Sequence, residues 1–251
     1  MRNLVMLGGL ALVALGCCFS PVFAQSTKSS PAAPASATAA HPDLSAVWVL
    51  GPAAPGSSSN FAFTKDEPPM TPWAEEKYRA AQPVFGANKK APQESDDPVY
   101  GCFPPGLPRI YLQRRPMEII QTSEEVIIAY QYDRLVRHIY TDGRPHDDFI
   151  DPPLWMGDSV GKWQGDTLVV DVIGFNDKTW LDRLGHPHSD ALHLVERFRR
   201  PDQATLVDDV TIEDPKAYSK PWTAHLQFQL KPGAEVNWEE VCEDEKLRDR
   251  Q

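Results

Sequence analysis

A polar segment between residues 175 and 193 carries the densest group of side chains able to do chemistry. Three of the seven histidines lie within eight residues of one another there, at His186, His188 and His193. An imidazole titrates near neutral pH, and a carboxylate beside it can orient the ring, so the two together can move a proton. The segment is therefore the leading candidate for a functional loop.

Two kinds of chemistry fit these residues. In an extended segment, side chains two residues apart point the same way, so His186 and His188, together with His193 or Asp190, would supply three ligands to a divalent metal. Without a metal, a histidine and an aspartate would act as acid and base in elimination, dehydration, isomerisation or hydrolysis. The alternative without function is a loop whose histidines only bond backbone groups. The catalytic candidates are His186, His188, His193, Asp190, Asp177 and Asp158, and the three histidines are also the metal-ligand candidates.

Aromatic and acidic residues near this segment suggest how a ligand would be held. Indole rings stack on aromatic, apolar and sugar-like faces, although most tryptophans simply fill a core. Glu196 shares a strand face with Leu194 and Phe198, so it is either a site carboxylate or one half of a buried ion pair. The ligand-binding candidates are Trp155, Asn176, Trp180 and Glu196.

Residues 157–161 match the G-x-S-x-G pattern of serine hydrolases, with Ser159 at its centre. A nucleophile elbow needs a strand before the serine and a helix after it. Here Pro152 and Pro153 precede the serine, and a hairpin signal at residues 164–166 follows it. The context therefore argues against a serine hydrolase.

The elements that must position these residues are strands. β-rich or alternating stretches separated by turn residues follow one another after Pro116, with almost no helix to make parallel crossovers. We therefore expect an all-β fold, an antiparallel lipocalin-like up-and-down barrel, with a β-sandwich as the alternative. The expected strands are 43–50, 118–122, 126–132, 135–141, 159–163, 167–175, 192–198, 205–212 and 222–230.

The first half of the chain reads differently because 16 of the 24 prolines fall within its first 116 residues. Proline removes a backbone donor and disfavours regular sheet, so this part should be extended and rich in loops. One short helix is expected from Pro72 until Pro83 stops it, with Thr71 as its cap.

The N-terminus is typical of an exported protein. Arg2, an apolar stretch over residues 4–19 and small residues before position 25 predict a signal peptide over residues 1–24. A Ser/Ala/Pro-rich stretch over residues 25–41 predicts a disordered linker, and residues 42–251 should form a single β-barrel domain. The expected location is periplasmic or secreted. The alternative is a lipoprotein anchored through Cys17, because residues 14–17 form a weak lipoprotein box.

Composition limits the partners. Cys102 and Cys242 are the two cysteines outside the signal, and an even pair in an exported chain predicts one disulfide between them. A net charge of −10 without any run of basic residues excludes nucleic acid as a partner. No stretch outside the signal is apolar for long enough to span a membrane. The expected partner is a small molecule, and the sequence gives no indication of oligomeric state.

Several motifs resemble a known group. Residues 43–45 before Trp48, residues 155–159 with 165–171, and residues 174–182 resemble a family of exported bacterial proteins of unassigned activity. The resemblance covers most of the chain after the signal. It implies export and a lipocalin-like barrel, and it assigns no chemistry.

Together these features predict an exported small-molecule enzyme, a lyase, isomerase or hydrolase, that uses His/Asp acid–base chemistry. The sequence does not decide whether a divalent metal assists this chemistry. The alternative is a non-catalytic lipocalin-like protein that binds a small aromatic, apolar or sugar-like ligand.

Overall fold

The structure is a computed structural model that describes residues 41–52, 61–239 and 242. The expected signal peptide at 1–24, the alternative anchor Cys17 and all of the expected linker except His41 lie outside the described residues. The ring of His41 stacks on that of Trp163, with centroids 4.6 Å apart.

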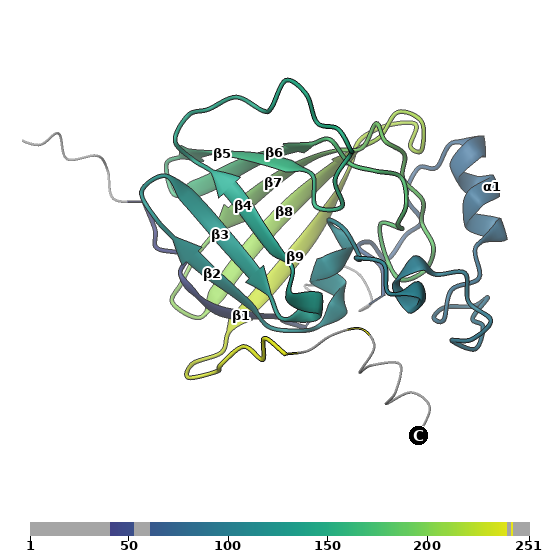
Figure 1. Cartoon of the computed structure of the whole chain (residues 1–251), viewed down its shortest axis with the longest axis horizontal. Coiled ribbons are helices and arrows are strands. Elements are labelled where there is room, and N and C mark those ends of the chain that lie inside the picture. The colour runs from purple at the N-terminus through teal and green to yellow at the C-terminus, as the bar shows by residue number, and fades with distance from the viewer. Residues whose placement is uncertain (1–40, 53–60, 240–241, 243–251) are drawn as a thin grey trace, which may run out of the picture. The chain divides into compact units, whose positions relative to one another are not determined.

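Nine strands in the described part of the chain form a closed barrel in which each strand pairs with its neighbours in sequence (Figure 1). The barrel closes because β1 pairs with β9, at Trp48 opposite Leu230. The all-β barrel expected from the sequence is therefore confirmed, and the β-sandwich alternative is not formed. The strands are β1 (Ala46–Leu50), β2 (Met117–Gln121), β3 (Glu125–Tyr130), β4 (Val136–Tyr140), β5 (Asp158–Gln164), β6 (Thr167–Ile173), β7 (His193–Arg199), β8 (Thr205–Glu213) and β9 (Trp222–Leu230).

One neighbouring pair departs from the expected antiparallel meander. Strands β4 and β5 run parallel, with Ile139 opposite Ser159 and Tyr140 opposite Val160. The long connection over residues 141–157 allows this, because it returns the chain to the end of the barrel at which β4 began. Close approach of the two strands requires Gly161, where an added Cβ would lie 2.8 Å from the Ile139 side chain.

Alternation along the strands fills the barrel with apolar side chains. In β8 and β9, for example, every second residue is buried, as at Val210, Ile212, Ala224 and Phe228. Three charged residues break this pattern, because Arg137, Glu196 and Asp208 are also buried on the inside.

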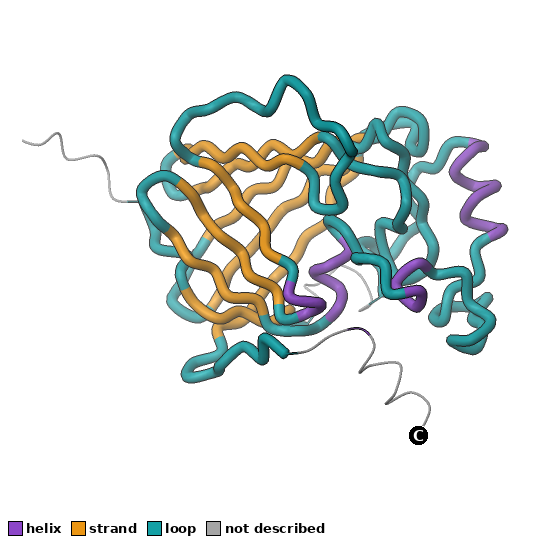
Figure 2. The backbone as a smooth tube through the Cα atoms, viewed as in Figure 1, coloured by secondary structure: helices purple, strands orange, loops and turns teal. Residues whose placement is uncertain are grey.

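The proline-rich part before β2 contains all the short helices of the described residues except η3, which lies between β3 and β4 (Figure 2). The α-helix α1 (Pro72–Ala80) begins as expected, since the Thr71 hydroxyl accepts a hydrogen bond from Ala74 N–H and Pro72 occupies the first turn. It ends at Ala80, three residues before Pro83. The sequence did not predict the three 3₁₀ helices, η1 (Pro98–Gly101), η2 (Arg109–Gln113) and η3 (Tyr132–Arg134).

The expected disulfide is present. Cys102 and Cys242 are bonded across a sequence separation of 140 residues, with their Cα atoms 5.6 Å apart. This bond ties the segment after η1 to the C-terminal part of the chain. None of the helices within the described residues has both the length and the apolar character needed to cross a membrane.

Candidate functional site

The candidate site is built on the connection between β6 and β7, residues 174–192, called here the site loop. Hydrogen bonds between residues two apart in the loop stabilise its turns, because Asn176 Oδ1 accepts from Lys178 N–H and Asp182 Oδ1 accepts from Leu184 N–H. Its C-terminal part is hydrogen-bonded to the residue that follows β8, since the backbone N–H and the hydroxyl of Ser189 donate to the buried Asp214 at 2.6 and 2.8 Å. The loop is therefore a rigid platform although it contains no regular structure.

A cavity of about 380 Å³ lies between the site loop and helix α1. Two indoles, two ammonium groups and two carboxylates contribute to its walls, so it offers flat apolar faces beside balanced charges. A pocket of this size suits a small organic molecule. The lining residues are Trp73, Lys77, Ala80, Ala81, Asp96, Pro98, Asp177, Lys178, Thr179, Trp180, Gly185, Pro187 and His188. We call this space the α1 cavity.

His188 is the histidine in the wall of the α1 cavity. Its side chain is buried, and its Nδ1 lies 3.1 Å from the carbonyl oxygen of Ser189. A carbonyl only accepts hydrogen bonds, so Nδ1 carries the proton, and Nε2 is then an unprotonated acceptor in the neutral ring. Nε2 is buried and has no hydrogen-bond partner among the described residues. Burial also lowers the pKa of His188, which keeps the ring neutral at pH 7.

His186 lies in the same loop but in the opposite protonation state. Its Nδ1 lies 2.5 Å from Asp182 Oδ2 and its Nε2 lies 2.8 Å from Glu67 Oε2, while the Tyr78 ring stacks on it with centroids 4.3 Å apart. Burial disfavours the charged ring, but the two carboxylates outweigh burial and raise the pKa of His186. The site loop thus holds one charged and one neutral imidazole, two residues apart.

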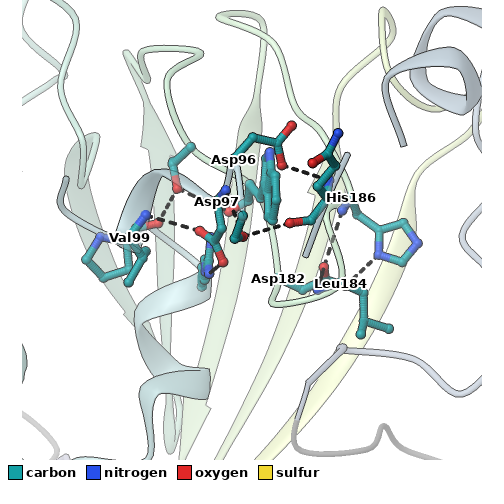
Figure 3. Close-up of polar contacts among 12 residues, drawn as sticks. Asp96, Asp97, Val99, Asp182, Leu184 and His186 are labelled. Atoms are coloured by element: carbon teal, nitrogen blue, oxygen red, sulfur yellow. Dashed lines mark hydrogen bonds and ion pairs between the residues drawn. The ribbon is translucent and has the colours of Figure 1, made fainter. Parts of the chain in front are cut away.

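Figure 3 shows the polar contacts that hold His186 and the neighbouring Asp97. On one side Asp182 holds His186, and on the other Asp97 accepts from Val99 N–H at the start of η1. Asp97 also forms a two-bond ion pair with the buried Arg109, at 2.6 and 2.9 Å. The guanidinium of Arg109 lies 5.6 Å from the ring centroid of Trp180.

The structure brings together only part of the set expected from the sequence. His188, Asp177 and Trp180 line the α1 cavity, and the buried Asn176 and His186 lie in the same loop. Asp190 is exposed in the turn that precedes β7. Trp155 lies outside the loop, where its ring contacts Phe103 at 5.7 Å.

Three expected residues belong to other parts of the barrel. His193 and Asp158 lie on the outer wall, at the starts of β7 and β5, and both bond side chains of that wall. Glu196 lies inside the barrel in a buried ion pair with Arg137, so it is structural here. Ser159 also points inside and accepts a hydrogen bond from Arg137 Nε, which places it in a packed interior rather than on a nucleophile elbow.

The three histidines do not converge as a metal site. His186, His188 and His193 bond three separate sets of partners, and no group of three His, Cys, Asp or Glu side chains in the described residues is arranged to hold a metal ion. The spacing argument fails because the site loop is not extended: Asp182 bonds the backbone of both Leu184 and His186, which turns the chain.

Sequence reasoning missed the residues that helix α1 and its flanks bring to the site. Trp73 and Lys77 are four residues apart, so they lie on one face of the helix, and Glu67 precedes the helix. Helical spacing could have indicated that face. Nothing in the sequence indicated that it would meet a loop about 100 residues away.

The arrangement can take a proton from a bound molecule. A neutral imidazole with an unprotonated nitrogen is able to accept a proton, and His188 is such a group, although its Nε2 is buried. Lys77 and Lys178 line the same cavity, and ammonium groups there would stabilise negative charge on a ligand. No protein-family model matches the chain, and a search of curated proteins found no relative.

Proposed function

We propose that this protein is an exported enzyme that performs acid–base chemistry on a small polar molecule bound in the α1 cavity. The observation that carries the proposal is His188, a buried neutral imidazole with a fixed tautomer and an unpartnered Nε2, in the wall of a cavity of about 380 Å³. A structural histidine normally uses both ring nitrogens or exposes one to water.

The reaction class follows from the charges beside His188. Removal of a proton from carbon leaves an enolate-like anion, which Lys77 and Lys178 would stabilise. Elimination and isomerisation both begin with this step. Hydrolysis through a serine nucleophile is less favoured, because the serine of the G-x-S-x-G pattern is buried inside the barrel.

The cavity favours a ligand with one flat apolar face and several hydroxyl groups. Trp73 and Trp180 offer rings for stacking, and Asp96 and Asp177 offer acceptors for hydroxyls. Because the two aspartates balance the two lysines, a neutral sugar with a carbonyl group fits better than a strongly charged compound.

Export is part of the proposal. The signal-like N-terminus and the resemblance to exported bacterial proteins support it, and a disulfide is typical of oxidising compartments. An exported, disulfide-bonded enzyme of this kind would act on molecules outside the cytoplasm.

A deuterium-exchange assay tests the catalytic step directly. Neutral monosaccharides, disaccharides and sugar acids are first screened for a rise in melting temperature, and those that bind are incubated with the protein in D₂O and followed by proton NMR. Deuterium at a carbon of the ligand reports proton abstraction even when no net product forms. We expect His188→Gln to lower this exchange about 100-fold or more, with ligand affinity largely retained.

The matched control is His225→Gln, because His225 is an exposed histidine on β9 that bonds Asp209 on the outer wall. It should change neither binding nor exchange, while Trp180→Ala should weaken binding. Binding without exchange or product for every ligand would refute the enzyme and favour the non-catalytic binding protein. No saturable ligand at all would refute the α1 cavity as a site.

A further inference from the structure

Five side chains on the outer wall of the barrel form a continuous row that the proposed reaction does not use. Carboxylates and imidazoles alternate along the row, in the order Asp158, His146, Asp171, His193 and Glu213. The successive N–O distances along the row are 2.7, 2.8, 2.7 and 3.2 Å. Four come from the adjacent strands β5, β6, β7 and β8, and His146 comes from the connection between β4 and β5. We call these five residues the outer row.

Both histidines of the outer row contact carboxylates through both ring nitrogens. A neutral imidazole has a single N–H, so its second nitrogen would present a lone pair to a carboxylate oxygen, which repels it. Only the doubly protonated ring donates at both nitrogens. The geometry of His146 and His193 is therefore that of imidazolium ions, each between two negative charges.

His146 belongs to residues 141–157, called here the latch segment, which leads from β4 back to β5 (Figure 1). The segment touches the site loop farther along. Leu154 N–H donates to Gly174 O at 2.8 Å, and Asn176 N–H donates to Leu154 O at 2.9 Å. Ile150 packs so closely on Gly174 that an added Cβ would lie 2.5 Å from its side chain.

The latch segment is thus fixed at one end by His146 and joined at the other to the first residues of the site loop. Asp177 and Lys178, which line the α1 cavity, directly follow that junction. Leu107 N–H also donates to Trp155 O at 3.2 Å, so this end of the segment has a further contact. Release of His146 from the barrel wall would loosen the segment between these contacts, and weaker hydrogen bonds at Leu154 would reduce the support of the first turn of the site loop.

We propose that the latch segment is a pH-dependent support for the site loop, closed while both histidines of the outer row donate from both ring nitrogens to carboxylates, and open when a rise in pH removes those bonds. Its regulatory meaning rests on the proposed function, because the site loop forms one wall of the α1 cavity. The closure itself does not depend on any ligand.

The sign of the effect follows from the charges. With both histidines protonated, two positive charges lie among three carboxylates. With both neutral, three negative charges remain close together. Burial disfavours the charged ring of His193, but Asp171 and Glu213 outweigh it and raise its pKa. Burial likewise opposes the charge of Asp171, but the two histidines outweigh it and lower the pKa of Asp171. A raised histidine pKa stabilises the closed form below its ordinary value near 6.5 and stops doing so as the pH rises through the raised value.

The groups that face the two histidines come from every packed element. Asp158 lies on β5, Asp171 on β6 and Glu213 on β8, and the latch segment adds the backbone N–H of Asp147, which donates to Asp158 at 3.2 Å. On β7, the next outward residue after His193 is Val195, which carries no charge. No cation other than the two imidazoliums contacts these carboxylates in the hydrogen bonds and ion pairs of the described residues.

Hydrogen–deuterium exchange read by mass spectrometry tests the proposal on the whole protein without any ligand. Exchange is measured at pH 6 and pH 8.5 and corrected for the intrinsic pH dependence of amide exchange. We expect exchange in peptides covering residues 147–157 to rise about tenfold or more at pH 8.5. Peptides covering residues 174–178 should follow, and those from β8 and β9 should stay unchanged.

Two variants distinguish an effect of the charge on His146 from a general increase in flexibility at high pH. His146→Gln removes the charge, so the segment should already exchange fast at pH 6 and show little further change. His146→Arg keeps a permanent charge and should slow exchange at pH 8.5. His225→Gln, which removes a histidine with a single carboxylate partner, should behave as wild type.

Equal corrected exchange at both pH values in the wild type, or the same rise in His146→Gln, would overturn the proposal. A rise confined to 147–157, with 174–178 still protected, would overturn its link to the site loop. Because the readout uses no ligand, a failed ligand screen with a working latch would refute only the proposed function.

Discussion

The charged cluster inside the barrel provides the sharpest stability test. Arg137 and Glu196 have side chains 1% and 0% exposed and form a two-bond ion pair, to which the Tyr111 hydroxyl adds a hydrogen bond at 2.7 Å. Breaking a buried pair by removing one partner costs about 3–5 kcal/mol, since the other charge is left without compensation. Glu196→Gln keeps the shape and removes the charge.

A second carboxylate modifies this expectation. Asp208 is fully buried beside the pair, where burial and then the charge of Glu196 raise its pKa well above the usual range, while Arg137 opposes the shift. When Glu196 is replaced, one cause of the raised pKa disappears, and Asp208 can ionise and partly neutralise Arg137. We therefore expect Glu196→Gln to lose about 3 kcal/mol, at the lower end of the range.

The double variant Glu196→Gln/Asp208→Asn also removes the carboxyl group of Asp208, so that no carboxylate can replace Glu196 beside Arg137. Its loss of stability should exceed the sum of the two single effects by at least about 1 kcal/mol, a coupling typical of residues in one charged network. For a domain of this size, the single loss corresponds to a fall in melting temperature of about 6–12 °C.

Urea unfolding with the disulfide intact measures these values. The matched control is Glu75→Gln on helix α1, whose partner Arg79 is 72% exposed, and it should lose about 0.5 kcal/mol or less. The reasoning is refuted if Glu196→Gln loses no more than Glu75→Gln, or if the two interior substitutions prove additive.

Two further predictions concern single groups. Cys242→Ala removes a bond that closes a long loop and should lower the free energy of unfolding by about 2–5 kcal/mol in oxidising buffer, with no difference from wild type once both are reduced. Asp208→Asn should gain stability relative to wild type as the pH rises above about 4. The reason is that a carboxyl group with a raised native pKa keeps its proton in the folded state at a pH where it has lost the proton in the unfolded state, so the wild type is destabilised as the pH rises. Parallel stability curves of the two proteins between pH 4 and pH 7 would contradict this prediction.

Much of the fold could be predicted from the sequence because the information is local. Alternation in residues 222–230 places Ala224, Leu226 and Phe228 in the core, and Thr71 with Pro72 starts helix α1, each through contacts with near neighbours in the chain. The disulfide was predictable because only one cysteine pair lies outside the signal-like segment.

The parallel pairing of β4 with β5 was not predictable in the same way. It depends on the path of the latch segment, which carries no regular pattern, and on contacts such as that between Gly161 and Ile139. A long irregular connection can end at either end of a barrel, and packing decides between them.

The sequence by itself determined which residues are able to do chemistry and that most of them lie in one polar segment between two strands. Only the tertiary structure decided their states. His186, His188 and His193 have the same side chain within eight residues, yet one lies between two carboxylates beneath Tyr78, one keeps Nε2 buried and unpartnered beside a cavity, and one joins a row on the outer wall. The charge of an imidazole depends on burial and on nearby carboxylates, and here these come from distant parts of the chain, at Glu67, Asp171 and Glu213. Local sequence cannot specify such neighbours, because folding brings them together.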